Sequence, residues 1–213
     1  FEEKNDNEKY LAVKEIITQL AEEHIKRTSA FCNSMDPMLF KDNEAKPLEN
    51  YANTLCEMCE AEEEEKYIVA IGTYGAAKGK TTQSTTYRNI ARYIPELNNS
   101  NFKVSLYFLD LLAMYVPNVG IFSSRGGDKM FKDTDSQHWH LCKDIAQAIL
   151  MIILHFRHFR KDRKKSNLHH TTVLVMGSFA KSWINNNNNN LLISNGIGPH
   201  PAALRGLKSE YGK

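Results

Sequence analysis

Cysteine is scarce in this chain of 213 residues, which also has no long hydrophobic run and little excess of one charge. Four scattered cysteines are too few for the disulfide framework of a secreted protein, and we find no signal-peptide pattern. The longest uncharged apolar run, residues 148–154, is far below the roughly 20 residues that span a bilayer. These absences predict an intracellular protein, in the cytoplasm or nucleus, with no membrane partner.

The formal net charge of +2 is too small to predict a nucleic-acid partner. Six acidic residues nevertheless crowd into 57–65, and six lysines and arginines into 157–165. A helix C-terminus favours cations, so the basic run fits the end of a helix as well as it fits a phosphate-binding patch. We therefore expect no nucleic-acid partner.

The composition, 42% apolar and 24% charged, is that of an ordinary globular protein. A chain of this length forms one core without help from metals or disulfides. We therefore expect a single domain over residues 1–213, with N-terminal helices between 8 and 61 packed on it. The chain begins at Phe1 rather than at methionine, which leads us to expect a piece of a longer protein.

Hydrophobic periodicity predicts strands separated by helices. Nearly continuous apolar runs predict buried strands at 66–72, 102–109 and 171–176. Apolar residues at helical spacing predict helices at 8–28, from Pro47 to about residue 61, at 82–94, and from residue 135 or 136 to 160. We expect a long loop at 114–135, a solvated asparagine-rich insert at 185–190, and one short strand or a ligand-binding loop within 191–204.

This alternation predicts an α/β protein with three α/β/α layers around a mostly parallel or mixed sheet. Ligands of such sheets bind at the carboxyl ends of the strands. Here those ends carry the sequence TYGAAKGK, then Asp110, and then GSFAKS. We therefore expect the binding site at this edge.

The segment GAAKGKTT at 75–82 is similar to a phosphate-binding P-loop. A full motif needs four residues between its first glycine and Gly-Lys, whereas Gly75 and Gly79 enclose three. A P-loop-like phosphotransferase using Lys80, with Asp110 as the acid that follows a strand, therefore remains a less favoured alternative.

Cys56 and Cys59 have a spacing found in zinc sites, and His138 and His140 offer further ligands. The two histidines cannot share one helical face, and buried free cysteine is common. We therefore expect neither a metal nor a cofactor.

Carboxylates lie in or beside the loop after the second strand, where they are suited to general acid–base chemistry. They are Asp110, Asp128, Asp133 and Asp135.

Three segments, in order, resemble the microbial-type poly(ADP-ribose) glycohydrolases, whose macrodomain-like fold binds ADP-ribose. Residues 75–95 (GAAKGKTTQSTTYRNIARYIP) resemble the family's glycine-rich loop, its A-Q-E-E motif and a helix ending in tyrosine and proline. Residues 106–122 (LYFLDLLAMYVPNVGIF) resemble the family's L-Y-T-D-x-A-I-Y-S-P-x-V-x-V-F segment with one extra residue. Residues 175–185 (VMGSFAKSWIN) look like its phosphate loop, V-L-G-A-W-G-C-G-x-F-x-N.

The resemblance implies a domain that binds ADP-ribose or a related nucleotide diphosphate, with ADP-ribosylated protein as a partner. It places the ligand on Gly75, Gly79, Gln83, Tyr115, Gly177, Ser178 and Phe179. The glycines and Ser178 would offer amides to the diphosphate, and Tyr115 or Phe179 would stack on the base or line the distal ribose cleft.

The family's catalytic glutamate pair falls on Ser84 and Thr85, which cannot protonate a leaving group. An ADP-ribosyl glycohydrolase activity would therefore have to use other acids, Asp110 or Asp128. The second hypothesis is a non-catalytic protein-interaction module with a degenerate pocket.

Overall fold

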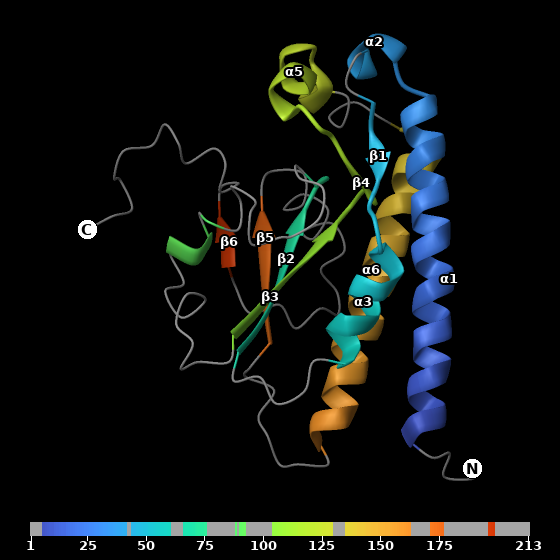
Figure 1. The fold of residues 1–213 in the computed structure, drawn as a ribbon, viewed down its shortest axis with the longest axis vertical. Helices are drawn as coiled ribbons and strands as arrows, with labels where there is room; N and C mark the ends of the chain where they lie inside the picture. The colour runs from blue at the N-terminus through green and yellow to red at the C-terminus, as the bar shows by residue number, and fades with distance from the viewer. Residues whose placement is uncertain are drawn as a thin grey trace.

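The computed structural model describes residues 6–41, 44–60, 66–75, 88, 90–92, 104–129, 135–162, 171–176 and 196–198. Its centre is a four-stranded sheet in the order β3-β2-β5-β6, with three helices against one face (Figure 1). The protein is therefore of the α/β class.

All four strands of this sheet run parallel. The strands are β2 (Lys66–Gly72), β3 (Val104–Asp110), β5 (Thr171–Met176) and β6 (Gly196–Gly198). The predictions for β2 and β5 are confirmed, and β6 is the short strand expected within 191–204. The strand predicted at 102–109 is described from Val104 and includes Asp110, which pairs with Gly72.

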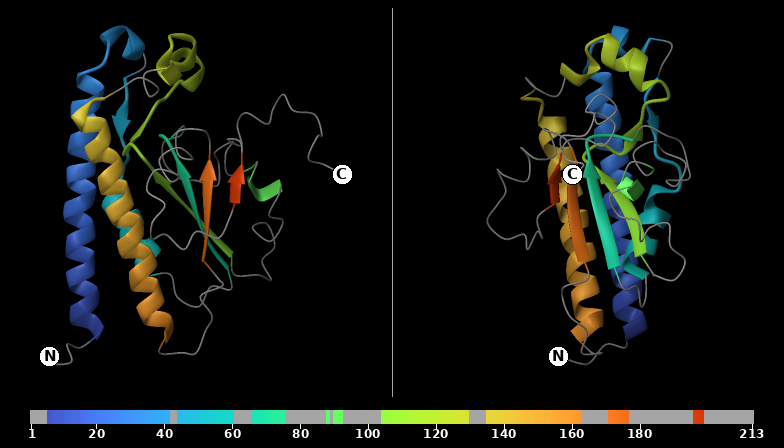
Figure 2. Two further views of the ribbon diagram at one scale, coloured as in Figure 1. Left: turned by 180° about the vertical axis from the view of Figure 1, so that it is seen from behind. Right: turned by 90° about the vertical axis from the view of Figure 1, so that its left-hand side faces the viewer.

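Three helices lie on one side of the sheet: α1 (Asp6–Asn33), α3 (Tyr51–Glu60) and α6 (Gln137–Asp162). Helix α1 packs against α3 and α6. Figure 2 shows α1 and α6 side by side along the height of the molecule. The core beneath them combines Leu55 of α3 and Ile149 of α6 with Val69 and Ile71 of β2. The helix predicted at 8–28 is confirmed and extends further, to Asn33.

A second apolar cluster lies on the opposite face of the sheet. It contains Ile68 and Ala70, which alternate with Val69 and Ile71 along β2, and Ile90 packs against it. Residues 88 and 90–92 are helical, in agreement with the helix predicted at 82–94; the rest of that range lies outside the described residues.

The prediction that Pro47 begins a helix is wrong. Pro47 ends β1 (Lys46–Pro47), which pairs antiparallel with β4 (Met114–Tyr115). The helix begins four residues later, after Asn50, whose φ is 54°. Pairing with β4 overrides the helix-start preference of proline, because the Leu48 amide also donates to the Ala113 carbonyl at 3.4 Å.

The prediction of a long loop at 114–135 is also wrong. This range contains β4, the helix α5 (Val119–Ser124) and a 3₁₀ turn, η3 (Gly127–Lys129). The Asn118 side chain begins α5 by accepting the Ile121 amide at 3.1 Å. Phe122 of this helix contacts Phe40, in the short helix α2 (Pro37–Phe40), and Tyr74. Tertiary packing therefore holds a helix whose own sequence is weakly helical.

Among the described helices, none is both long and apolar enough to cross a membrane. The asparagine-rich insert predicted at 185–190 lies outside the described residues.

Candidate functional site

The carboxyl ends of the parallel strands form one edge of the sheet, as the parallel arrowheads of Figure 2 show. The chain passes from β2 to β3 on one side and then returns to β5 on the other side of β2. This reversal is a topological switch point, outside which α/β sheets bind their ligands. The edge between β2 and β5 is therefore the part of the described fold best suited to a ligand.

Asp110 ends β3 beside Gly72, which ends β2. A Cβ atom on Gly72 would overlap the Oδ1 atom of Asp110, and it would lie 3.5 Å from Cε of Met176 at the end of β5. The missing side chain of Gly72 thus leaves the space that the carboxyl group occupies. Three adjacent strand ends meet around this carboxyl.

Asp110 is only 8% exposed, and burial raises its pKa to about 7. Burial is the cause of this shift, because removal of a carboxyl group from water disfavours its ionised form. A carboxyl group with a pKa near neutrality holds a proton at the pH of the cell and can also release it. This property suits a general acid.

A buried histidine supports the backbone immediately after Asp110 from the helical side of the sheet. His24 of α1 lies with Nε2 at 2.9 Å from the Leu111 carbonyl oxygen and with Nδ1 at 2.9 Å from the Tyr51 phenol oxygen. Burial lowers the pKa of His24 to about 4, so the ring is neutral at pH 7. Because a carbonyl can only accept, Nε2 carries the proton, and Tyr51 donates to Nδ1.

One turn further along α1, Thr28 binds the same segment of backbone. Its Oγ1 accepts the Ala113 amide at 3.0 Å and lies 3.7 Å from the Cys142 sulfur of α6. The spacing of four residues places His24 and Thr28 on one face of α1. The helix therefore holds both Leu111 and Ala113.

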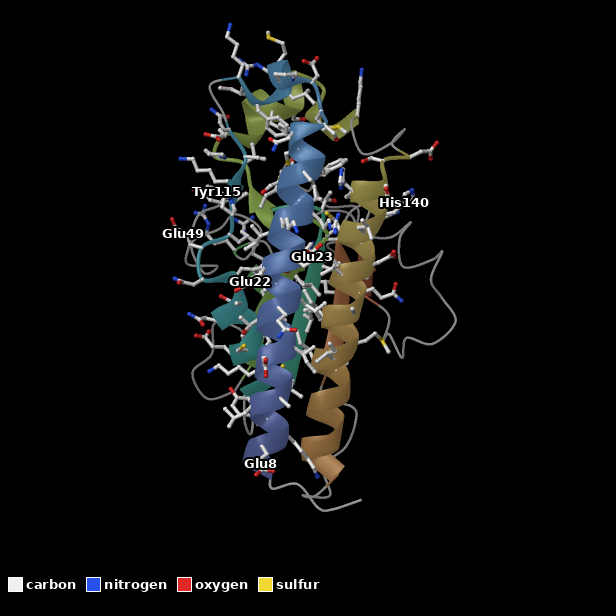
Figure 3. The ribbon with its side chains drawn as sticks, turned by 90° about the vertical axis from the view of Figure 1, so that its right-hand side faces the viewer. Glu8, Glu22, Glu23, Glu49, Tyr115 and His140 are labelled. Atoms are coloured by element: carbon white, nitrogen blue, oxygen red, sulfur yellow. The ribbon has the colours of Figure 1, made fainter. Side chains whose placement is uncertain are left out.

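Gly75 and Tyr115 come together at this edge through a parallel β-bridge. The Gly75 amide donates to the Met114 carbonyl at 2.9 Å, and its carbonyl accepts the Val116 amide at 3.1 Å. The expectation that the Gly75 amide is open to a diphosphate therefore needs correction, since the protein itself uses it. Tyr115, labelled in Figure 3, is 5% exposed, so stacking on a base would require its side chain to move.

The remaining predicted residues are distributed as follows. Asp128 lies in η3, which follows α5 in the chain. Outside the described residues lie Gly79, Lys80, Gln83, Ser84, Thr85, Asp133, Gly177, Ser178 and Phe179. Of the predicted site residues, the described structure pairs Gly75 with Tyr115 and places Asp110 at the end of β3, beside Gly72.

The cysteines and histidines whose spacing is found in zinc sites are not assembled into a metal site in the described part of the chain. Cys56 and Cys59 are both buried in α3, and His140 is exposed on α6 (Figure 3). Within the described ranges no group of three or more histidine, cysteine or acidic side chains is placed to hold a metal ion.

The sequence patterns gave no prediction that His24, Thr28 and Tyr51 support the strand-end backbone. The sequence gives one indication of this role: His24 and Tyr51 occur at positions of the helical pattern that are otherwise apolar. A polar side chain at such a position needs a buried hydrogen-bond partner.

Comparison with known protein families, with characterised protein sequences and with solved structures finds no match for this chain.

Proposed function

We propose that this protein binds ADP-ribose or a related nucleotide diphosphate at the carboxyl edge of its parallel sheet and cleaves a glycosidic bond of the ribose, with Asp110 as the general acid. The observation that carries the proposal is the buried Asp110 carboxyl seated over Gly72. The switch point between β2 and β5 supports the location. The segments that resemble the macrodomain-like glycohydrolases support the ligand.

The proposed reaction is a hydrolysis. Asp110 transfers its proton to the leaving atom as the bond from that atom to the anomeric carbon breaks. Water adds to the anomeric carbon and releases a proton, which restores the acid. With its pKa raised to about 7, Asp110 carries the proton in about half of the molecules at neutral pH, whereas a carboxyl group with the ordinary value would be almost wholly ionised.

Two measurements test this function. Isothermal titration with ADP-ribose measures binding, and release of ADP-ribose from ADP-ribosylated protein measures hydrolysis. We expect Asp110→Asn to bind the ligand while losing about 10²- to 10⁴-fold in rate. Asp144→Asn, at an exposed position of α6, controls for the loss of one carboxylate.

Each contrary result has a definite meaning. No heat and no thermal shift at millimolar ADP-ribose would rule out this ligand. Retained hydrolysis in Asp110→Asn, together with loss in Asp128→Asn, would transfer the acid role to Asp128.

A protein-interaction module is the second candidate, and the internal use of the Gly75 amide favours it. A protein partner recovered by pull-down, together with absent ligand binding, would support this candidate.

A further inference from the structure

His24 is a buried titratable group that the proposed reaction does not use. It is fully buried in α1, yet both of its ring nitrogens have partners from other parts of the fold. One partner, Tyr51, belongs to α3, and the other, Leu111, directly follows the residue proposed as the acid. A buried group of polar side chains destabilises the fold unless each of them has a hydrogen-bond partner, so the arrangement of these residues is tightly specified.

The direction of each hydrogen bond in this array is fixed. Burial, and to a lesser extent the charge of an ionised Asp110, raises the pKa of the Tyr51 phenol, so Tyr51 stays protonated and donates to Nδ1 of His24. The ring is then the Nε2-protonated tautomer, which donates to the Leu111 carbonyl. Reversing either bond would leave the carbonyl facing a nitrogen without a proton.

The Leu111 peptide also connects this array to Gly72. The Leu111 amide donates to the Gly72 carbonyl at 3.0 Å, so β2 holds one side of the residue and His24 holds the other. Asp110 itself points to the opposite face of the sheet, since it alternates with Leu109 of the helix-side core. His24 thus acts on Asp110 through the backbone and does not touch its carboxyl group.

We propose that His24 is a positioning residue for Asp110: with its tautomer fixed by Tyr51, it holds the Leu111 peptide and so keeps the Asp110 carboxyl seated over Gly72. This proposal depends on the proposed function only in giving Asp110 the role of general acid. Without the His24 bond, the buried Leu111 carbonyl has lost its partner, and the strand end relaxes toward water to recover one. The carboxyl then gains hydration.

Two similar substitutions distinguish the effects of the two hydrogen bonds of His24. In His24→Gln the longer amide can still donate to Leu111, whereas in His24→Asn the shorter amide can accept from Tyr51 but falls short of Leu111. Thr28→Val is the matched control, because it removes the neighbouring contact of α1 with Ala113 and leaves His24 intact.

The readout is the pKa of the Asp110 carboxyl, measured by ¹³C NMR titration of the protein without ligand. We expect a value of about 7 in the wild type, in His24→Gln and in Thr28→Val. In His24→Asn we expect the pKa to fall by about one unit or more. Equal values in His24→Gln and His24→Asn, or an equal fall in Thr28→Val, would overturn the proposal.

The wild-type protein supplies a second test that needs no variant. The ¹⁵N shifts of the His24 ring should report protonation at Nε2, and a ring protonated at Nδ1 would also overturn the proposal. Both measurements are made without ADP-ribose. A failure of ligand binding therefore leaves the positioning result standing, and a failure of positioning leaves the ligand assignment open to its own test.

Discussion

The Oδ1 atom of Asp110 occupies the space that the Cβ atom of any other residue at position 72 would need. The two residues are paired neighbours at the ends of adjacent parallel strands, so neither backbone can withdraw without disturbing the sheet. A glycine is thus part of the reason that a carboxyl group can be buried at this edge.

Gly72→Ala should displace the Asp110 carboxyl. Because the added methyl group takes the place of Oδ1, we expect the carboxyl to turn toward water and its pKa to fall from about 7. Stability should drop by about 1–3 kcal/mol from overpacking. NMR titration of Asp110 and urea unfolding measure the two effects.

Gly75→Ala is the stability control for that variant, since its added Cβ would meet no atom closer than 3.4 Å. An unchanged pKa of Asp110 in Gly72→Ala would contradict the displacement of its carboxyl group by the added methyl group.

Asp110→Asn should change how stability depends on pH. The folded state holds the Asp110 proton up to about pH 7, whereas the ordinary pKa is 3.8. The folded state therefore binds more protons between these values, and this contribution to stability is full below about pH 4 and is lost as the pH rises to 7. We expect the wild type to lose about 4 kcal/mol relative to Asp110→Asn across this range.

Urea unfolding between pH 4 and 8 measures that difference, with Asp144→Asn as the control for the loss of one exposed charge. Wild-type and Asp110→Asn curves that stay parallel throughout this range would contradict the burial of Asp110.

His24 should affect the pH dependence of stability in the opposite direction to Asp110, and His24→Gln should remove this effect. The pKa of His24 is lowered from 6.5 to about 4, so the folded state binds fewer protons between these values. Its contribution is full above about pH 6.5 and is lost as the pH falls to 4. The wild type should therefore lose about 3 kcal/mol relative to His24→Gln on acidification.

The comparison uses unfolding curves at several pH values, with His140→Gln at an exposed position of α6 as the control (Figure 3). If His140→Gln changes the pH dependence as much as His24→Gln does, the effect does not come from the buried ring. In the wild type the slopes from His24 and Asp110 oppose each other between pH 4 and 6.5, so each variant should expose the slope of the other group.

Gly127→Ala should destabilise the region around α5. An added Cβ would overlap the Phe122 ring, which Phe40 and Tyr74 hold in place. We expect a loss of about 1–3 kcal/mol in the free energy of unfolding, measured by urea denaturation.

Gly120→Ala is the matched control within the same segment, because its Cβ would lie 3.5 Å from the Asn118 side chain, an ordinary contact. We expect unchanged or slightly higher stability there, since alanine favours a helix. Equal losses in both variants would argue against the overlap with Phe122.

The sequence predicted the elements that have strong local signals. No tertiary information was needed to predict β2, β5 and α6. A continuous apolar run indicates a strand buried on both faces, and an apolar stripe indicates a helix buried along one face. Prediction from the sequence failed at α5 and at Pro47, where contacts between segments distant in sequence outweigh local preference. Asp110 could be selected as a candidate because it follows a strand, but its environment could not be foreseen.

The order of apolar and polar residues by itself determined an α/β protein with a mostly parallel or mixed sheet and a polar edge, because burial of apolar surface acts along every segment. Only the tertiary structure decided that Asp110 sits over Gly72, that the Gly75 amide is used internally, and that His24 binds the peptide after Asp110. These relationships join residues up to 87 positions apart. Their geometry depends on strand order and helix packing, which residue spacing alone does not specify.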